Sequence, residues 1–191
     1  MDLETLVLKP AIALHSGVDI LERFLGHDHW TTNQLIEQSK VLTQQQLEHR
    51  FDLGHGTVLA TLEHIVDNIE TWVDLMNGGQ FRTLADPQQR WSTLAGLQSR
   101  LDVAAAELAT LAMRVQRDQR SDDLWTDVLD KPPTQKSFGG AIVHIITHSM
   151  HHRAQLIHML KRLGVQDVLE GDALGWERTV VGDPSSSPRL V

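Results

Sequence analysis

The sequence predicts an all-α protein folded as one four-helix bundle, with a loosely ordered C-terminal tail. Four long segments carry apolar residues at spacings of three and four, and no segment shows a sustained alternation typical of strands. The four segments are similar in length, which is typical of a bundle. A chain of 191 residues is long enough for one well-formed core but short for two. We therefore place the bundle at residues 1–170 and the tail at 171–191.

The first two helices have recognisable ends. The first is predicted from about Ser16 to Ser39, and Thr43 then caps a short helical turn. The second is predicted from about Gly56 to Met76, because Val58, Leu62, Ile65 and the apolar residues after them recur along one face. The sequence NGG follows at 77–79, and Asn and Gly commonly end a helix.

The last two helices are bounded by proline and glycine. Asp86-Pro87 predicts the start of the third, as a cap followed by the residue best tolerated in a first turn, and its heptad-spaced apolar residues reach about Gln119. The fourth is predicted from about Ser137 to Leu163, before Gly164. The end of the chain, GDPSSSPRLV, is rich in turn-forming residues, and we expect it to be loosely ordered.

Composition and charge argue against several classes of partner. The formal net charge is −8, and no clustered Lys/Arg face offers phosphates a binding surface, so we expect no nucleic-acid partner. No apolar stretch approaches the roughly 20 residues of a membrane span, and the start MDLETLVLKP does not have the layout of a signal peptide. We expect a cytoplasmic protein. Surplus apolar residues in the first and third helices, including Trp30 and Trp91, favour a homodimer.

The chain contains no cysteine. This excludes disulfides, thiolate zinc sites and a cysteine nucleophile. A transition metal would therefore need His, Asp or Glu ligands, and thiol chemistry would need a thiol supplied from outside.

Five histidines lie in HIITHSMHHRAQLIHML, residues 144–160. At about 100° per residue, His148 and His152 border the apolar stripe of this helix, whereas His151 and His158 face solvent. Residues four apart on a helix have Cβ atoms about 5–6 Å apart, so His148 and His152 could bind one ion. Alternatively, they are core-edge histidines that hydrogen-bond to polar neighbours.

A further ligand would have to come from another helix. His64 lies in the second helix, between its apolar stripe and its charged face, where a lone histidine is either structural or a ligand. Bundles assemble metal sites from side chains on facing helices. We expect His144 to be a hydrogen-bonding neighbour of the site rather than a ligand. The remaining histidines show no useful spacing and are assigned to surface or capping roles: His15, His27, His29, His49 and His55.

Three blocks of the sequence together resemble a known family. They are HDHWTTNQLIEQSKVLTQQQL, HGTVLATLEHIVDNIETWV and THSMHHRAQLIHMLKRLG. In order and spacing they are similar to the DinB or YfiT-like family of bacterial four-helix-bundle metalloenzymes. The similarity runs from the first helix to Gly164 and leaves the tail unmatched.

The resemblance implies a metal site. In that family, an "aHi" histidine on the second helix and the pattern "nHxxHHRGq" on the last long helix bind one divalent metal through three imidazoles. By position, the ligands here are His64, His148 and His152. The sequence has Thr147 where the family often has Asn and Ala154 where it often has Gly, but both changes leave the ligands in place. Zinc or nickel is expected, with iron as a further option.

Three neutral imidazoles leave a divalent ion at least one open position, as in catalytic rather than structural sites. Similar proteins are associated with transfer of low-molecular-weight thiols, such as bacillithiol or mycothiol, to electrophiles. The leading hypothesis is therefore a metal-dependent thiol S-transferase. The alternatives are a hydrolase that uses activated water and a metal-binding bundle without turnover. No HExxH motif or Glu-x-x-His pair indicates metalloprotease or di-iron chemistry, and no catalytic residue beyond the ligands is assigned.

Overall fold

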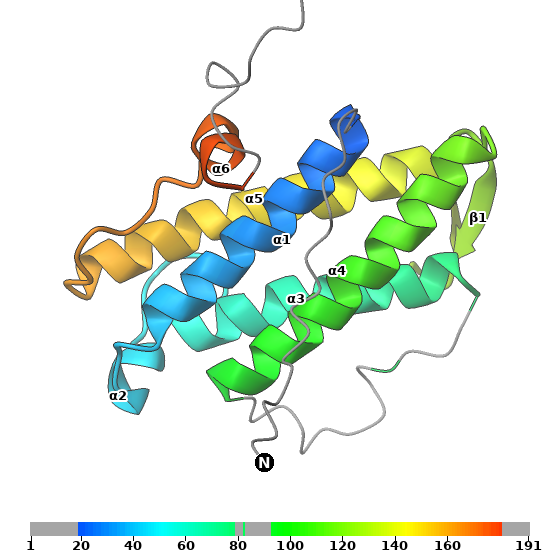
Figure 1. The fold of residues 1–191 in the computed structure, drawn as a ribbon. Coiled ribbons are helices and arrows are strands. Elements are labelled where there is room, and N and C mark those ends of the chain that lie inside the picture. The colour runs from blue at the N-terminus through cyan, green and yellow to red at the C-terminus, as the bar shows by residue number, and fades with distance from the viewer. Residues whose placement is uncertain (1–18, 79–81, 83–92, 181–191) are drawn as a thin grey trace, which may run out of the picture.

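A computed structural model describes residues 19–78, 82 and 93–180, and this part of the chain is mostly helical (Figure 1). The elements in chain order are α1 (Ile20–Ser39), α2 (Gln44–Leu47), α3 (Val58–Met76), α4 (Leu94–Arg117), β1 (Leu124–Asp127), β2 (Thr134–Ser137), α5 (Phe138–Arg162) and α6 (Ala173–Val180). Helices α1, α3, α4 and α5 form the predicted four-helix bundle.

The four long helices enclose one apolar core. Helix α1 packs against α4 and α5, and α3 packs against the same two helices, so each long helix has two main neighbours. The largest fully buried side chains come from all four helices: Leu35, Ile36, Leu62, Ile65, Ile69, Leu97, Leu101, Leu108, Ile145, Leu156, Met159 and Leu160. Their spacing of three and four along each helix explains why the helical period in the sequence identifies this core.

Side-chain caps set where the helices begin. Asp19 and Glu22 form a capping box at the start of α1, and Thr57 and Ser137 cap α3 and α5. The predicted limits of the second and fourth helices are confirmed to within two residues. The predicted starts at Ser16 and Asp86 lie outside the described residues. The third helix is nevertheless not continuous from Asp86, because Thr93 has extended backbone and its hydroxyl accepts the N–H of Gly96 in the first turn of α4.

A short antiparallel hairpin is the main departure from the all-helical expectation. Strands β1 and β2 pair with Leu124 opposite Ser137 and Asp127 opposite Thr134. Each strand has only four residues, which is too short for a period-two pattern to stand out in the sequence. The hairpin leads directly into α5, since Ser137 both ends β2 and caps that helix.

The region beyond residue 170, expected to be loosely ordered, contains helix α6 in its described part. Trp176 of α6 is only 3% exposed and packs against α1. Gly26 permits this contact, because a Cβ there would lie 2.9 Å from the indole ring of Trp176. The Nε2 atom of His27 also lies 2.7 Å from the carbonyl oxygen of Gly171. An apolar anchor and a polar contact thus attach residues 171–180 to α1.

Two expectations about the molecular surface can be compared with the described residues. None of the described helices is long and apolar enough to cross a membrane. Of the two tryptophans that suggested a homodimer, Trp30 is partly buried in α1 and Trp91 lies outside the described residues. The homodimer remains a prediction.

Candidate metal centre

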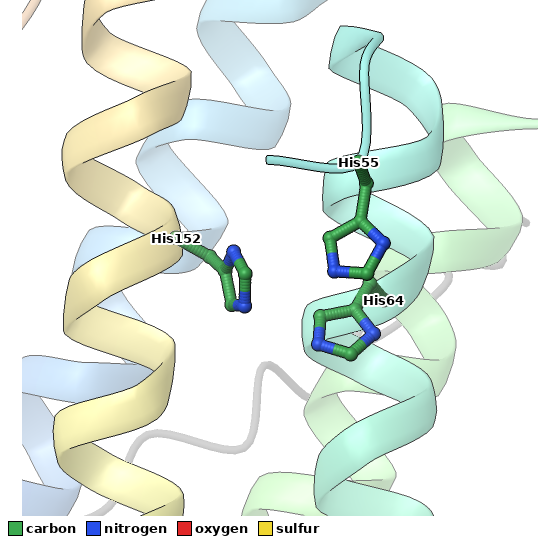
Figure 2. Close-up of side chains that lie close together, drawn as sticks. All are labelled: His55, His64 and His152. Carbon is green, nitrogen blue, oxygen red and sulfur yellow. The ribbon is translucent and has the colours of Figure 1, made fainter. Parts of the chain in front are cut away.

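Four histidine rings gather between α3 and α5. His64 projects from α3, His148 and His152 project from α5, and His55 lies in the loop before α3. The Nε2 atom of His148 is 2.9 Å from Nε2 of His64 and 3.1 Å from Nε2 of His152. His55, His64 and His152 each present a ring nitrogen within 4.8 Å of the other two (Figure 2). The structure therefore brings together the three histidines predicted from the sequence and adds His55.

Two Nε2–Nε2 separations in the cluster are those expected of ligands to a shared cation. A neutral imidazole nitrogen carries either one N–H or one lone pair, so Nε2 of His148 can form only one ordinary hydrogen bond. It nevertheless has two imidazole nitrogens at hydrogen-bonding distance, those of His64 and His152. Two nitrogens bound to one ion at about 2.0–2.1 Å lie roughly 2.9–3.4 Å apart, depending on the angle at the ion. His55, His64 and His152 of this cluster could hold a divalent metal ion, and imidazole ligands leave the choice of ion open.

Gln155 fixes the orientation of His152. Its side-chain oxygen lies 2.9 Å from Nδ1 of His152, so Nδ1 carries the proton and Nε2 presents its lone pair to the cluster. The amide nitrogen of Gln155 lies 2.9 Å from Nε2 of His151, which accepts this second hydrogen bond. Metal-binding histidines usually have such a partner on the ring nitrogen that faces away from the ion. Gln155 therefore holds His152 in the tautomer that a metal site requires.

His55 is exposed, as its assignment to a surface role implies, but it also belongs to the cluster, which the sequence did not indicate. Its ring stacks on that of His64, with ring centroids 3.7 Å apart and planes inclined by 26°. Gly54 and Gly56 on either side have positive φ angles of 52° and 84°, so the backbone reverses direction at His55. The sequence GHG, nine residues before His64, was the available signal. Helical periodicity could not detect it because it lies in a loop.

The exposed histidines of α5 are placed as predicted. His151 and His158 are both exposed, as the helical period indicated. His144 is also exposed, and it contacts its neighbours through its ring. Its centroid lies 5.2 Å from that of His148 and 5.0 Å from that of Trp72. It therefore flanks the cluster through ring contacts, and the hydrogen-bonding role expected of it stays a prediction.

Two of the remaining histidines connect helices rather than lie free on the surface. His27 contacts the carbonyl oxygen of Gly171, and His29 Nε2 lies 2.7 Å from a carboxylate oxygen of Asp102 on α4. Both side chains are partly buried, so their assignment to surface or capping roles was wrong. His49 is exposed beside Phe51, and His15 lies outside the described residues.

An aromatic wall next to the cluster was missed in the sequence. The indole N–H of Trp72 donates to Asn68 one turn earlier, and the Trp72 ring packs edge-to-face on Trp125 of β1. Lys136 of β2 lies over the Trp72 ring at 5.0 Å and pairs with Asp127. Trp72 in turn contacts His144 of α5. The ring contacts therefore run from His144 on α5 to Trp72 on α3 and to Trp125 on β1. Only the tertiary packing of the hairpin brings these residues together.

Burial favours the neutral, metal-binding form of His64 and His148. Desolvation, reinforced by neighbouring histidines, lowers the pKa of His64 and of His148 from 6.5 to about 4. Desolvation and His152 likewise lower the pKa of His55. A neutral imidazole is the form that binds a metal. Protons therefore compete weakly for His64 and His148 at neutral pH.

The same pKa values predict how the stability of the metal-free protein depends on pH. Between about pH 6.5 and pH 4 the unfolded chain binds protons at His64 and His148 that the folded protein does not. The free energy of unfolding should therefore rise with pH across this window and fall on acidification. Urea denaturation in the presence of a chelator at several pH values measures it. Replacing both histidines by Gln should flatten the dependence relative to His158→Ala, and equal slopes in the two variants would contradict the prediction.

Comparison with known proteins places the chain in a family. No curated protein matches the sequence. The family model described as the DinB family matches residues 17–170, a span that includes α1 to α5 and the four clustered histidines. With most of its length matched by that model, and with a helical bundle that carries a histidine cluster between α3 and α5, the chain belongs to the DinB family.

Proposed function

We propose that the protein is a divalent-metal-dependent transferase that passes a low-molecular-weight thiol to an electrophilic substrate. The observation that supports this most directly is the convergence of Nε2 atoms from His64, His148 and His152 at about ligand spacing. Three neutral ligands would leave zinc or nickel its positive charge and an open position. Such a position suits an anionic, polarisable ligand such as a thiolate.

The residues of the proposed site have two roles, which are to bind the ion and to orient a ligand. His64, His148 and His152 would hold the ion, and Gln155 keeps His152 in the correct tautomer. The bound ion would supply Lewis acidity, which lowers the pKa of a coordinated thiol so that its thiolate forms near neutral pH. The thiol proton would pass to solvent. The thiolate sulfur would then form a bond to the electrophilic carbon as the leaving group departed with its electron pair.

The chain supplies no thiol of its own, because it contains no cysteine. The side chains of the cluster are imidazoles and contain no sulfur, and burial keeps His64 and His148 neutral. The sulfur nucleophile would therefore be a diffusible molecule. The exposed His144 and the partly buried Trp72, which contact one another beside His148, would offer a second reactant an aromatic surface close to the sulfur.

Thiol dependence separates transfer from hydrolysis. Metal-loaded protein is mixed with a model electrophile such as 1-chloro-2,4-dinitrobenzene and increasing amounts of bacterial low-molecular-weight thiols, and consumption of the electrophile is followed. A transferase should accelerate the reaction above the metal-free protein and above metal-treated His148→Ala. A hydrolase would instead be inhibited by the thiol, because sulfur would occupy the position that water needs. Suppression, or indifference across the thiol panel, would contradict the proposal.

A further inference from the structure

The imidazole of His55 lies on the solvent side of the cluster. Its ring stacks on His64, and its centroid is 5.0 Å from that of His152. In Figure 2 the rings of His55 and His64 lie one above the other, and each turns a nitrogen toward His152. His55, His64 and His152 therefore present ring nitrogens to a common point, within 4.8 Å of one another.

The loop that carries His55 is built to hold it there. The N–H of Phe51 donates to the carbonyl oxygen of Gly56 at 2.7 Å, and the N–H of Gly56 donates to Leu53 at 2.9 Å. Gly54 lies so close to Gln155 that an added Cβ would be 2.1 Å from the side-chain oxygen. The amide that orients His152 therefore also contacts the loop. This packing couples the position of His55 to the geometry of the cluster.

His55 differs from the three other imidazoles in ways that make it exchangeable. His64, His148 and His152 project from helices and are partly or fully buried, whereas His55 is exposed and projects from a loop. Its nitrogen lies within 4.8 Å of those of His64 and His152, and ligands to one tetrahedral ion lie about 3.4 Å apart. An exposed ligand on a loop is more easily displaced than one fixed on a helix.

We propose that His55 is a fourth metal ligand, which occupies the open position in the resting protein and is displaced by the thiol. The inference rests on the proposed function, because it assumes an ion at His64, His148 and His152. In the exchange, the bond between the ion and the His55 nitrogen breaks, a bond to sulfur forms, and the thiol proton passes to solvent. While His55 is bound, the ion has no open position for water. A thiolate, which binds the ion more strongly than imidazole, would take that position by displacing His55.

Cobalt provides a direct readout, because its absorption and X-ray absorption spectra report the number and type of its ligands. Wild type loaded with Co²⁺ is compared with His55→Ala, with the more conservative His55→Gln, and with His49→Ala as a control from the same loop region. Both His55 variants should keep one bound Co²⁺, lose one imidazole from its coordination shell, and bind the ion at least about 10-fold more weakly. His49→Ala, whose ring packs on Phe51, should behave as wild type.

Adding 2-mercaptoethanol to wild type tests displacement. A sulfur-to-cobalt charge-transfer band should appear together with the loss of one imidazole, and in His55→Ala the band should appear at lower thiol concentration. Unchanged affinity and imidazole count in both His55 variants would overturn the assignment of His55 as a ligand. Entry of sulfur without loss of an imidazole would overturn its displacement. Neither result affects the three-histidine site, whereas failure of wild type to bind Co²⁺ would overturn both the proposed function and this inference.

Discussion

Replacement of His64, His148 or His152 by Ala should each lower the affinity for zinc or nickel by more than about 100-fold. The three Nε2 atoms lie 2.9 and 3.1 Å from their neighbours in the cluster, so removal of one leaves an ion with two helix-borne ligands. Removal of a group that only orients a ligand typically costs 10- to 100-fold in metal affinity, and loss of a ligand should cost more. The effect should also exceed that of replacing His55, which is exposed and projects from a loop.

The adjacent exposed histidines provide matched controls for these variants. His151 directly precedes His152, and His158 lies on the same helix, but both are exposed. His151→Ala and His158→Ala should keep a full equivalent of metal. Protein purified without an affinity tag, metal analysis and competition with a chromophoric chelator give the occupancy and the affinity. Full occupancy and wild-type affinity in His148→Ala would rule out the site as described.

The parts of the fold and site that the sequence predicted are those governed by helical period. Fully buried residues such as Ile65 on α3 and Ile145 on α5 recur at three and four, so the faces of these helices could be assigned before their packing was known. The same geometry separated His148 and His152 from His151. His64 was ambiguous by period, because it lies at the margin of its stripe, and the resemblance to the DinB family resolved it. Bringing His64 to His148 requires α3 to pack on α5, which no local pattern encodes.

The features that the sequence did not predict depend on loops and on tertiary contacts. His55 reaches the cluster because the backbone reverses between Gly54 and Gly56, and its contact with His64 exists only in the folded chain. Helix α6 has eight residues, and its position depends on Trp176 packing where Gly26 leaves room. A stretch of that length contains too few turns for a period to be distinguished from chance. The positions of residues on loops and short helices therefore could not be predicted from helical periodicity.

A buried ion pair next to the metal centre carries the largest expected effect on stability. Arg153 follows His152 on α5 and points toward α1, where its guanidinium contacts the carboxylate of Asp28 and lies 3.3 Å from the hydroxyl of Thr32. Asp28 and Arg153 are each 3% exposed. Burial raises the pKa of the Asp28 carboxyl, and the charge of Arg153 opposes this rise. Desolvation thus offsets much of the attraction, and the pair as a whole should contribute little net stability.

Removal of one partner of this pair should nevertheless be severe. Asp28→Leu would leave a buried guanidinium without its counter-charge, and Arg153→Met would leave a buried carboxylate, so each should lower the free energy of unfolding by about 3–5 kcal/mol. The double variant buries no unpaired charge and should be more stable than either single variant. Urea denaturation of wild type, the two single variants and the double variant gives the coupling energy between Asp28 and Arg153. As a control, Lys40→Ala removes the exposed ion pair with Glu37 and should leave the urea midpoint unchanged. Additive losses in the double variant would show that Asp28 and Arg153 stabilise the fold independently rather than as a buried pair that links α1 to α5 beside His152.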